Sequence, residues 1–369
     1  MKIIVYFNSM LPAGGIERVI AKHIRFLAPN HEIILFTKDD GTSFYTLPDS
    51  VKRESLGIEM NLDMNSRIKR IYKILSRFFK TSLILRRKLK KNDPDIIYVA
   101  SPLSLLEVFI SQLSCCKILV TEHSSFTAYN SIYKFIAKIL YKRVGLLTVP
   151  TSADSEFYTA CGISNVYLPN PLSFFPDVSS SLQNKIVLNV GRFTNDKRHE
   201  LLINLWSMTK GKENGWKLKI IGKGENLEKM KALIYDLKLD KSVFILPPTK
   251  EIETEFTSSS IFALTSRNEG FGLVLAEAMA SGVPCVAFNC PSGPKDIITN
   301  SRNGFLVEEG NHDLFVNYLD QLMENEDLRL TLGAQSRIDI RKFDEAIVCK
   351  KLNLLVDKTF SINHGGLNL

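Results

Sequence analysis

The chain has no long uninterrupted hydrophobic run, and this absence argues against a membrane-spanning helix. No apolar stretch in its 369 residues approaches the roughly 18 residues that such a helix requires. The start, MKIIVYFNSM, has one lysine and a short strand-like apolar run that soon meets polar residues, so it lacks the long apolar region of a secretory signal. We therefore expect a cytoplasmic protein.

Cysteine is scarce, and no two cysteines form a CxxC pair. Most of the six lie in apolar runs, where reduced and buried thiols are common. They are Cys115, Cys116, Cys161, Cys285, Cys290 and Cys349. A disulfide framework or a structural zinc site is therefore not expected.

The composition that remains is that of a globular protein with more than one core. Hydrophobic residues make up 45% of the chain and charged residues 23%, as in ordinary soluble domains. A chain of 369 residues is too long for one core and fits two domains of about 150 to 200 residues each.

Buried strands alternate with helical stretches in both halves of the chain, which predicts an α/β fold with two doubly wound parallel sheets. The expected strands are at 3–7, 33–37, 96–100, 118–121 and 146–149, then at 186–190, 218–221, 243–246, 261–264, 285–288 and 305–307. Residues 169–184 are rich in Pro, Ser and Asn without a sustained period, so we interpret them as the interdomain linker. We expect domains over 1–175 and 185–343, followed by a final segment over 344–369.

The segment TSRNEGFGLVLAEAMASGVP, residues 265–284, is the most informative part of the chain. Glu269 leads a glycine-flanked turn, and Glu277 follows on a helix of good helix formers. Gly282 and Pro284 suit the end of that helix. The N-terminus of a helix that follows a strand and a glycine turn offers unpaired N–H groups to anions, so a phosphate or a sugar hydroxyl is the expected ligand.

Three other loops carry glycine directly after an expected strand. Gly14 and Gly15 follow the first strand and precede an amphipathic helix, while Gly191 and Gly222 follow two strands of the second half. Glycine lets the backbone approach a ligand closely, so these loops are candidates for contacts to a phosphate or a sugar. A simple turn is the alternative, since glycine is a common turn residue.

Two cations, Arg192 and Lys197, follow the strand expected at 186–190, in the sequence GRFTNDK. Such a pair suits the phosphate groups of a ligand, most of all where negative charge grows on a leaving phosphate. Arginine can bind two phosphate oxygens at once, and lysine supplies a compact charge. The alternative is that both are ordinary solvated surface charges.

In order along the chain, four segments resemble the motifs of the retaining glycosyltransferases of family 4. MKIIVYFNSMLPAGGIERV resembles the family's first strand and glycine loop, TEHSS the segment with its active-site histidine, NVGRFTNDKRHELLI its phosphate clamp, and EGFGLVLAEAMASGVP its donor-sugar motif. The resemblance spans roughly residues 1–310. It implies two Rossmann-like domains facing across a cleft, the arrangement called GT-B, and a final helix near 344–360 that crosses back onto the first domain.

The resemblance also implies roles for individual residues. Arg192 and Lys197 would clamp the phosphates, Glu269 would lie by hydroxyls of the donor sugar, and Glu277 would bond the ribose, since a carboxylate accepts from two hydroxyls at once. The backbone groups implied beside the sugar and the phosphate are those of Phe271, Gly272 and Leu273. Glu269 could also support an oxocarbenium-like transition state, by analogy with glycoside cleavage. Two surface glutamates on an amphipathic helix are the alternative.

His123 stands just past the strand expected at 118–121 and before two serines. The resemblance implies that it contacts the donor sugar or the reacting centre. A structural or exposed histidine is the alternative, because the near-neutral pKa of histidine makes it useful without being diagnostic. Glu122 beside it is a lesser candidate.

Neither the sugar nor a metal can be assigned from the motifs. The loop CPSGPKD departs from the version with Gly-Gly and Glu found in many family members, so no sugar identity is carried over from it. No DxD pair follows a strand in a position to hold a metal and a diphosphate, so we expect no metal and no other cofactor.

The net charge of +8 is unevenly placed. The segment that begins at Arg67 and ends at Lys91 has no acidic residue and interleaves Ile, Leu and Phe with Arg and Lys. Such a basic amphipathic helix or helix pair suits an anionic membrane surface or the phosphates of a lipid-linked acceptor, and residues 133–143 are a second candidate. The alternative is a set of helices packed on the sheet with a solvated basic face. No nucleic-acid module is recognisable, so nucleic acid is not an expected partner.

We therefore expect a retaining glycosyltransferase that moves a hexose or N-acetylhexosamine from a nucleoside diphosphate sugar to a glycan acceptor. UDP is the expected nucleotide, and the expected acceptor is a lipid-linked intermediate of bacterial surface polysaccharide, met at the inner face of the cell membrane by a peripheral protein. The alternatives are a sugar-nucleotide epimerase of the same architecture and a non-catalytic membrane or glycan-binding protein. The intact glutamates and cation pair argue against the non-catalytic protein.

Overall fold

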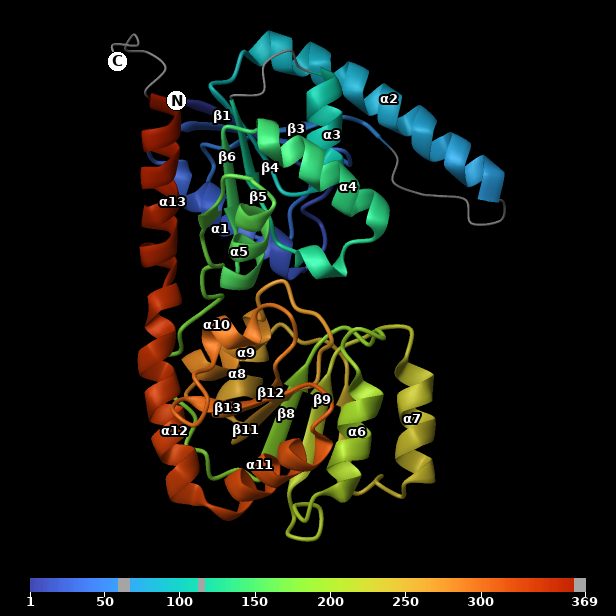
Figure 1. Ribbon diagram of the computed structural model, residues 1–369, viewed down its shortest axis with the longest axis vertical. Helices are drawn as coiled ribbons and strands as arrows, with labels where there is room; N and C mark the ends of the chain where they lie inside the picture. The colour runs from blue at the N-terminus through green and yellow to red at the C-terminus, as the bar shows by residue number, and fades with distance from the viewer. Residues whose placement is uncertain (59–66, 112–116, 362–369) are drawn as a thin grey trace. The chain divides into compact units, whose positions relative to one another are not determined.

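The computed structural model describes residues 1–58, 67–111 and 117–361, with the side chains of the long helix α2 described from residue 76 onward (Figure 1). The chain forms two compact units. The first comprises Met1–Pro171 and Glu345–Leu369, and the second comprises Leu172–Asp344. Each unit is built on one parallel sheet, which confirms the predicted α/β class.

The sheet of the first unit has the strand order β3-β2-β1-β4-β5-β6-β7. Its strands are β1 (Lys2–Phe7), β2 (Glu32–Thr37), β3 (Lys52–Ser55), β4 (Ile96–Val99), β5 (Ile118–Thr121), β6 (Leu146–Val149) and β7 (Val166–Tyr167). In register, Ile3 lies opposite Ile33 on one side and Ile96 on the other. This is the order of a doubly wound sheet, in which ligands bind beyond the carboxyl ends of the strands.

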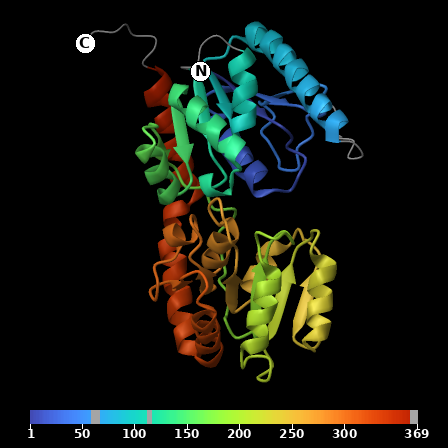
Figure 2. The same cartoon turned by 45° about the vertical axis from the view of Figure 1, so that its right-hand side comes forward.

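Helices cover both faces of this sheet (Figures 1 and 2). Side chains alternate along β1, so that Ile3 and Val5 enter one core and Ile4 and Tyr6 enter the other. The first core includes α1 (Gly15–Leu27) and α13 (Glu345–Phe360). The second includes α2 (Arg67–Asn92), α3 (Pro102–Ser111), α4 (Ser131–Leu140) and α5 (Ser152–Ala160), with short 3-10 turns η1 (Phe126–Ala128) and η2 (Tyr141–Arg143) on either side of α4.

The sheet of the second unit has the strand order β10-β9-β8-β11-β12-β13, again parallel. Its strands are β8 (Ile186–Val190), β9 (Lys217–Ile221), β10 (Val243–Leu246), β11 (Ile261–Leu264), β12 (Cys285–Phe288) and β13 (Gly304–Val307). One face packs on α6 (His199–Met208), α7 (Leu227–Asp236) and α11 (His312–Glu324). The elements on the other face are α8 (Ile252–Thr257), α9 (Leu273–Ala280), α10 (Pro294–Ile297) and the 3-10 turn η3 (Ile340–Phe343), while α12 (Glu326–Asp339) precedes η3.

All eleven strands expected from the sequence are present, and two further strands were missed. β3 reads KRES and lies at one edge of its sheet, while β7 has only two residues and lies at the other edge. Neither has the buried apolar run on which the prediction relied, because an edge strand is covered less completely than a central one. The basic segment that begins at Arg67 forms one helix, α2, rather than a pair.

The predicted linker at 169–184 contains no helix or strand, yet part of it is buried. Leu172 and Leu182 belong to a core of the second unit, and Leu172 N–H donates to the Phe343 carbonyl at 2.9 Å. The N-terminal part of the first unit ends at Pro171, so most of this segment packs as part of the second unit.

The described cysteines are free thiols. Cys285, Cys290 and Cys349 are buried and Cys161 is partly buried. Burial raises the pKa of the Cys290 and Cys349 thiols to about 12, which keeps them protonated and unreactive. Cys115 and Cys116 lie outside the described residues.

Candidate active site

In the second unit, the predicted donor-binding loops lie at the carboxyl ends of neighbouring strands. Gly222 follows β9, Gly191 follows β8, and the turn led by Glu269 follows β11. These strands are adjacent in the order β9-β8-β11. Because the sheet is parallel, their carboxyl ends share one edge, so loops far apart in the sequence come together at the place where such sheets bind ligands.

Lys197 and Glu269, predicted as separate site residues, form an ion pair at this edge. Lys197 Nζ donates to Glu269 Oε1 at 2.6 Å. The Glu269 side chain is 8% exposed and that of Lys197 is 20% exposed, so the pair is largely shielded from water. Ser292 Oγ also donates to the Glu269 carbonyl oxygen at 2.9 Å, which fixes the turn from the loop after β12. The Glu269 carboxylate thereby holds the lysine ammonium in a defined place, and the other two N–H groups of the ammonium can donate to a ligand.

Arg192 adds a second cation to the same loop. It is exposed, whereas the neighbouring Phe193 is completely buried. The buried ring anchors the loop on the core, and the guanidinium remains accessible to a ligand. A loop that fixes its backbone while presenting two cations is suited to binding a diphosphate.

Gly222 is required by a close approach between two loops. A Cβ atom at this position would lie 1.9 Å from the Gly191 carbonyl oxygen and 2.8 Å from the Phe193 ring. The loops after β8 and β9 therefore touch through their backbones. The structure thus brings Gly191 and Gly222 together, as expected for loops at one edge of a parallel sheet.

The predicted turn and helix after β11 are present. Gly272 is the N-cap of α9 with φ 96°, a left-handed conformation that favours glycine. Phe271 before it is buried and meets Phe343 edge-on, with ring centroids 5.1 Å apart, so this side chain anchors the turn while its backbone remains a candidate for ligand contacts. Leu273 begins α9, and Glu277 lies buried within it at 4% exposure.

Arg198, which was not predicted as a site residue, connects three loops at this edge of the sheet through its side-chain contacts. It adopts a left-handed conformation with φ 51° and donates to the Thr265 carbonyl oxygen at 2.6 Å. Its guanidinium also forms a bidentate pair with Glu309, with Nη2 2.8 Å from Oε2. Arg198 adjoins the predicted clamp lysine, but nothing in the sequence links it to a glutamate 111 positions away.

His199, also missed, is a neutral histidine buried beneath the clamp. Its ring meets Phe193 edge-on, with centroids 5.1 Å apart, and its Nε2 would lie 3.5 Å from a Cβ atom on Gly191. Burial, and then the nearby Lys197 charge, lower its pKa to about 4. The ring is therefore uncharged near neutral pH and does not add to the positive charge of the edge.

In the first unit, Gly14 and Gly15 lie where the predicted glycine loop meets its helix. Gly14 is the N-cap of α1 and Gly15 is its first residue. Glu17 lies in the first turn, and a Cβ atom on Gly14 would come within 2.1 Å of its Oε2. Glu17 is therefore placed to orient this loop, since carboxylates are favoured at a helix N-terminus.

His123 follows β5 at the carboxyl edge of the first sheet. The residue is 8% exposed, and its Nε2 lies 3.1 Å from Thr121 Oγ1. Burial lowers the pKa of His123 to about 4, with a smaller opposing effect from Asn170. The ring is therefore neutral near pH 7, so it can donate a hydrogen bond from one nitrogen and accept one at the other.

Glu122 anchors the segment that carries His123. It is buried, and it accepts hydrogen bonds from Tyr129 Oη at 2.8 Å and from Tyr141 Oη. Burial raises its pKa to about 7, while the two tyrosine hydroxyls act in the opposite direction and Asp154 adds a smaller increase. Tyr129 precedes α4 and Tyr141 follows it, so this carboxylate holds both ends of that helix.

Replacing Glu122 with glutamine is expected to change the pH dependence of stability. The folded-state pKa near 7 is above the usual 4.5, so the contribution of Glu122 is most favourable at low pH and falls as pH rises to about 7. The parent should lose up to about 3 kcal/mol relative to Glu122→Gln between pH 5 and pH 8. Urea unfolding of both proteins at the two pH values measures this, and other titrating groups cancel in the comparison. A constant difference would show that the Glu122 pKa is not raised.

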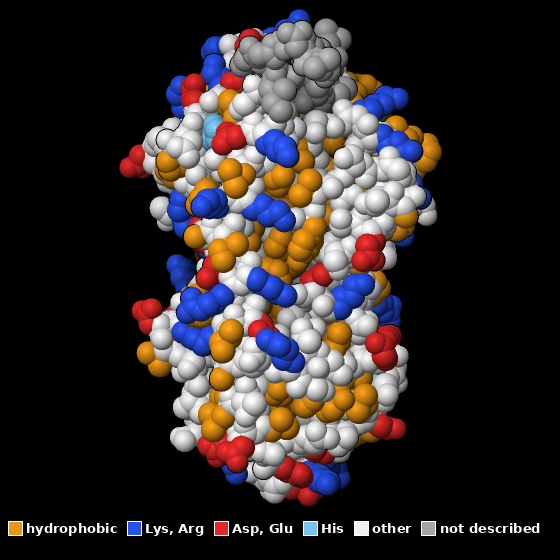
Figure 3. Space-filling model, turned by 60° about the vertical axis from the view of Figure 1, so that its left-hand side comes forward, with side chains coloured by type: hydrophobic (Ala, Val, Ile, Leu, Met, Phe, Trp, Pro, Cys, Tyr) orange, Lys and Arg blue, Asp and Glu red, His pale blue; other side chains and the backbone are white. Residues whose placement is uncertain are grey.

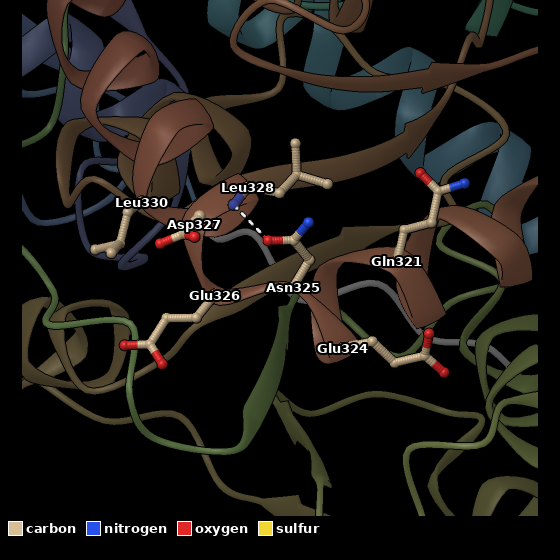
Figure 4. Close-up of a pocket in the computed structure, with 7 residues that line it drawn as sticks. All are labelled: Gln321, Glu324, Asn325, Glu326, Asp327, Leu328 and Leu330. Carbon is tan, nitrogen blue, oxygen red and sulfur yellow. Dashed lines mark hydrogen bonds between the residues drawn. The ribbon is translucent and has the colours of Figure 1, made fainter.

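A surface hollow in the second unit does not coincide with these residues (Figure 4). It is lined by Gln321, Glu324, Asn325, Glu326, Asp327, Leu328 and Leu330, where α11 meets α12. Asn325 Oδ1 accepts from the Leu328 N–H at 2.9 Å and so caps α12. Three carboxylates and no cation line this hollow, so its charge is wrong for a nucleoside diphosphate.

Residues 1–58, 67–111 and 117–361 contain no group of three or more His, Cys, Asp or Glu side chains placed to hold a metal ion. Over the same ranges, no helix combines the length and the apolar character needed to cross a bilayer.

Two protein-family models match consecutive parts of the chain. The model described as glycosyltransferase family 4 matches residues 13–172, and the model described as glycosyl transferases group 1 matches residues 174–339. The boundary between the two matches falls close to the boundary between the two compact units, after Pro171.

Curated relatives match along nearly the whole chain. An uncharacterized glycosyltransferase of Haemophilus influenzae is 29% identical over 91% of this chain and 94% of its own length. The amylovoran biosynthesis glycosyltransferase AmsD of Erwinia amylovora is 28% identical over 95% and 98%. An α-1,4-N-acetyl-D-galactosaminyltransferase of Campylobacter jejuni, whose named acceptor is a glycan on diphospho-undecaprenol, is 23% identical over 93% and 95%.

Solved structures share the fold. The apo form of the lipopolysaccharide outer core galactosyltransferase WaaB matches with a TM-score of 0.76 and 24% identity over 97% of this chain and 99% of its own. HepE of Anabaena, in complex with UDP and glucose, matches with a TM-score of 0.77 and 17% identity over 97% and 100%. The fold of this chain is therefore the GT-B fold of these enzymes.

These matches confirm the family and the enzyme class that the motifs indicated. The relatives act in bacterial polysaccharide and lipopolysaccharide biosynthesis. The chain is a glycosyltransferase and belongs to family 4.

Proposed function

We propose that this glycosyltransferase moves a hexose or N-acetylhexosamine from a UDP-sugar to a lipid-linked glycan, with retention of the anomeric configuration. The observation that carries the proposal is the Lys197–Glu269 pair, 2.6 Å long, at the carboxyl edge where Gly191 and Gly222 meet. In the proposed site, Lys197 would supply a cation for the diphosphate and Glu269 a carboxylate for the sugar. The UDP bound in HepE and the undecaprenol-linked acceptor of the Campylobacter relative support the nucleotide and the acceptor class.

The proposed chemistry needs charge stabilisation more than it needs a nucleophile. As the bond from the anomeric carbon to the phosphate oxygen breaks, charge grows on the leaving diphosphate, and Lys197 and Arg192 would stabilise that charge most in the transition state. The acceptor hydroxyl attacks from the face that the diphosphate leaves, and its proton passes to a leaving phosphate oxygen. Glu269 is already bonded to Lys197, so we assign it to the sugar hydroxyls and to the developing positive charge rather than to a covalent intermediate.

A screen of UDP-sugars against lipid-linked acceptors tests the proposed function. We expect one donor to give stoichiometric UDP release and a glycosylated lipid product. Incubation of each donor without acceptor separates the alternatives, because an epimerase would isomerise the donor under that condition. Failure to bind any nucleotide would instead favour a non-catalytic protein.

Activity is expected to survive EDTA. The proposed clamp neutralises the diphosphate with Arg192 and Lys197, so no divalent cation is needed to hold it. The measurement is the transfer rate of protein treated with EDTA and then dialysed, compared with untreated protein. Loss of activity on chelation, with recovery on adding Mg²⁺ or Mn²⁺, would show that a metal takes part.

We propose that the first unit meets an anionic membrane through α2 and α4. From residue 76 to its end at Asn92, α2 has no carboxylate, and Arg86, Arg87, Lys90 and Lys91 are all exposed. The face drawn in Figure 3, in contrast, carries Asp and Glu as well as Lys and Arg side chains. A helix that presents several exposed cations attracts anionic lipids.

The helix α4, which contains most of the second predicted segment, exposes apolar side chains. Ile132, Phe135 and Ile139 of α4 are 69%, 67% and 40% exposed and recur at helical spacing. Lys138, also exposed, lies among them. Apolar side chains next to basic ones are typical of helices that lie in a membrane interface.

Replacing Arg86, Arg87, Lys90 and Lys91 with glutamine is expected to weaken sedimentation with anionic vesicles. Each charge near the surface contributes roughly 1 kcal/mol of attraction that weakens with salt. Transfer to a lipid-linked acceptor in vesicles should fall, whereas transfer to a short soluble analogue should fall much less.

A matched control removes the same charge from the other unit. Lys229, Lys231, Lys238 and Lys241 are exposed on α7 and in the segment that follows it. Their replacement with glutamine should leave vesicle binding close to that of the parent. Equal vesicle binding by the α2 variant and the parent would assign α2 to an ordinary helix surface.

A further inference from the structure

Four buried side chains of the first unit form a continuous hydrogen-bonded chain that ends on His123. His23 Nδ1 on α1 lies 2.9 Å from Tyr98 Oη on β4. Thr121 Oγ1, the last residue of β5, donates to Tyr98 Oη at 2.7 Å and lies 3.1 Å from His123 Nε2. None of the four residues is more than 8% exposed.

The Thr121–Tyr98 hydrogen bond sets the direction of the chain, because Thr121 Oγ1 is its donor. Thr121 Oγ1 donates its hydroxyl hydrogen to Tyr98 Oη. Tyr98 Oη therefore donates its own hydrogen to His23 Nδ1, its other neighbour. For the same reason Thr121 Oγ1 accepts a proton from His123, which must then carry hydrogen on Nε2. Each hydroxyl donates once and accepts once, and each histidine is neutral.

Both histidines are suited to that neutral state. Burial lowers the pKa of His23 to about 3 and that of His123 to about 4, with the neighbouring histidine as a further cause for His23. A protonated His23 would have no lone pair for the Tyr98 proton, so the direction of the chain depends on its neutrality.

We propose that Tyr98 and His23 are positioning residues that hold His123 as the Nε2–H tautomer, so that its Nδ1 acts only as a hydrogen-bond acceptor for a hydroxyl of the bound sugar. This inference rests on the proposed role of His123 at the donor sugar. Nδ1 is buried and makes no hydrogen bond within the described structure, while the Asn170 side chain interacts with the same ring. A sugar hydroxyl that reaches Nδ1 would meet a lone pair there, never a proton.

The tautomer also limits what His123 can do. A ring whose only N–H is hydrogen-bonded to Thr121 cannot protonate a leaving group from Nδ1. His123 would therefore accept a hydrogen bond from a hydroxyl group of the sugar and orient that group. Tyr98 and His23 contact no substrate in this account. They act through Thr121, and their loss should affect turnover through the orientation of His123.

The test combines imidazole ¹⁵N NMR with kinetics on the full-length protein. In the parent, the His123 signal, assigned by its loss in His123→Gln, should show Nε2 protonated and Nδ1 bare. Tyr98→Phe removes the link, so His123 should become a mixture of tautomers, and kcat should fall about 3- to 30-fold with a smaller change in KM, the range expected for one misplaced hydrogen bond. His23→Gln, whose side-chain oxygen can still accept from Tyr98, should retain the parent tautomer.

Tyr158→Phe is the matched control, because Tyr158 is another buried tyrosine of the same unit whose hydroxyl makes no hydrogen bond within the described structure. It should leave the His123 signal and kcat unchanged. Hydrogen on Nδ1 in the parent, or an unchanged His123 signal in Tyr98→Phe, would overturn the chain itself. A changed tautomer with unchanged kcat would refute the catalytic part of the inference and place the error in the proposed role of His123.

Discussion

Replacing Lys197 with alanine is expected to reduce turnover far more than it weakens donor binding. The lysine charge would meet a phosphate that becomes more anionic in the transition state, and single contacts of this kind lower barriers by about 2 to 4 kcal/mol. The substitution also leaves Glu269, which is 8% exposed, without its cation. Arg192→Ala should act in the same direction. Steady-state kinetics and UDP titration measure the two effects separately.

A second lysine–glutamate pair of the same unit provides the control. Lys219 Nζ lies 2.7 Å from Glu255 Oε2, and both side chains are about a quarter exposed, at 23% and 25%. Lys219 lies within β9, away from the loops of the carboxyl edge. Lys219→Ala should therefore leave kcat close to that of the parent. Near-normal turnover in both Lys197→Ala and Arg192→Ala would remove the clamp from the mechanism.

Replacing Gly222 with alanine is expected to destabilise the second unit and weaken UDP binding together. The new Cβ atom would lie 1.9 Å from the Gly191 carbonyl oxygen, so one of the two loops must move. Overpacking in a tight site costs about 1 to 3 kcal/mol, and contact with a backbone atom leaves no flexible side chain to absorb it. Thermal unfolding with and without UDP measures both effects, and the shift that UDP produces should shrink in the variant.

Gly310→Ala separates this steric effect from the general cost of losing a glycine. Gly310 has φ 86°, and a Cβ atom added there would have no described neighbour within 4 Å, so alanine meets backbone strain without a steric clash. The substitution should cost about 1 to 2 kcal/mol without changing the response to UDP. An unchanged UDP response in Gly222→Ala would show that the contact between the two loops does not shape the donor site.

The architecture followed from the sequence because most strands are buried on both faces. β1, β4, β5 and β11 are almost wholly apolar, and each was expected within a residue or two of its observed bounds. β3 was not anticipated, since its sequence, KRES, has no apolar residue and it joins the sheet by backbone pairing with β2. Pairing of this kind depends on the partner strand, which a local pattern does not reveal.

The candidate site was predictable in its parts but not in its connections. Glu269 and Lys197 were each expected from the motif that contains them, yet the ion pair between them spans 72 positions and depends on the adjacency of β8 and β11. The Arg198–Glu309 pair and the hydrogen-bonded chain of side chains that runs from His23 to His123 also join residues that lie far apart in the sequence. Motifs identify residues that suit a chemistry, whereas the sheet order decides which of them meet.

The central claim is retaining transfer from a UDP-sugar, and NMR observation of the reaction as it proceeds tests it most directly. The parent enzyme is mixed with the donor selected by the screen and a lipid-linked acceptor, and the anomeric proton signals of donor and product are followed together with UDP release. We expect the first product formed to have the anomeric configuration of the donor, with one UDP released for each sugar transferred. A first product of the opposite configuration, or isomerised donor without transfer, would contradict it.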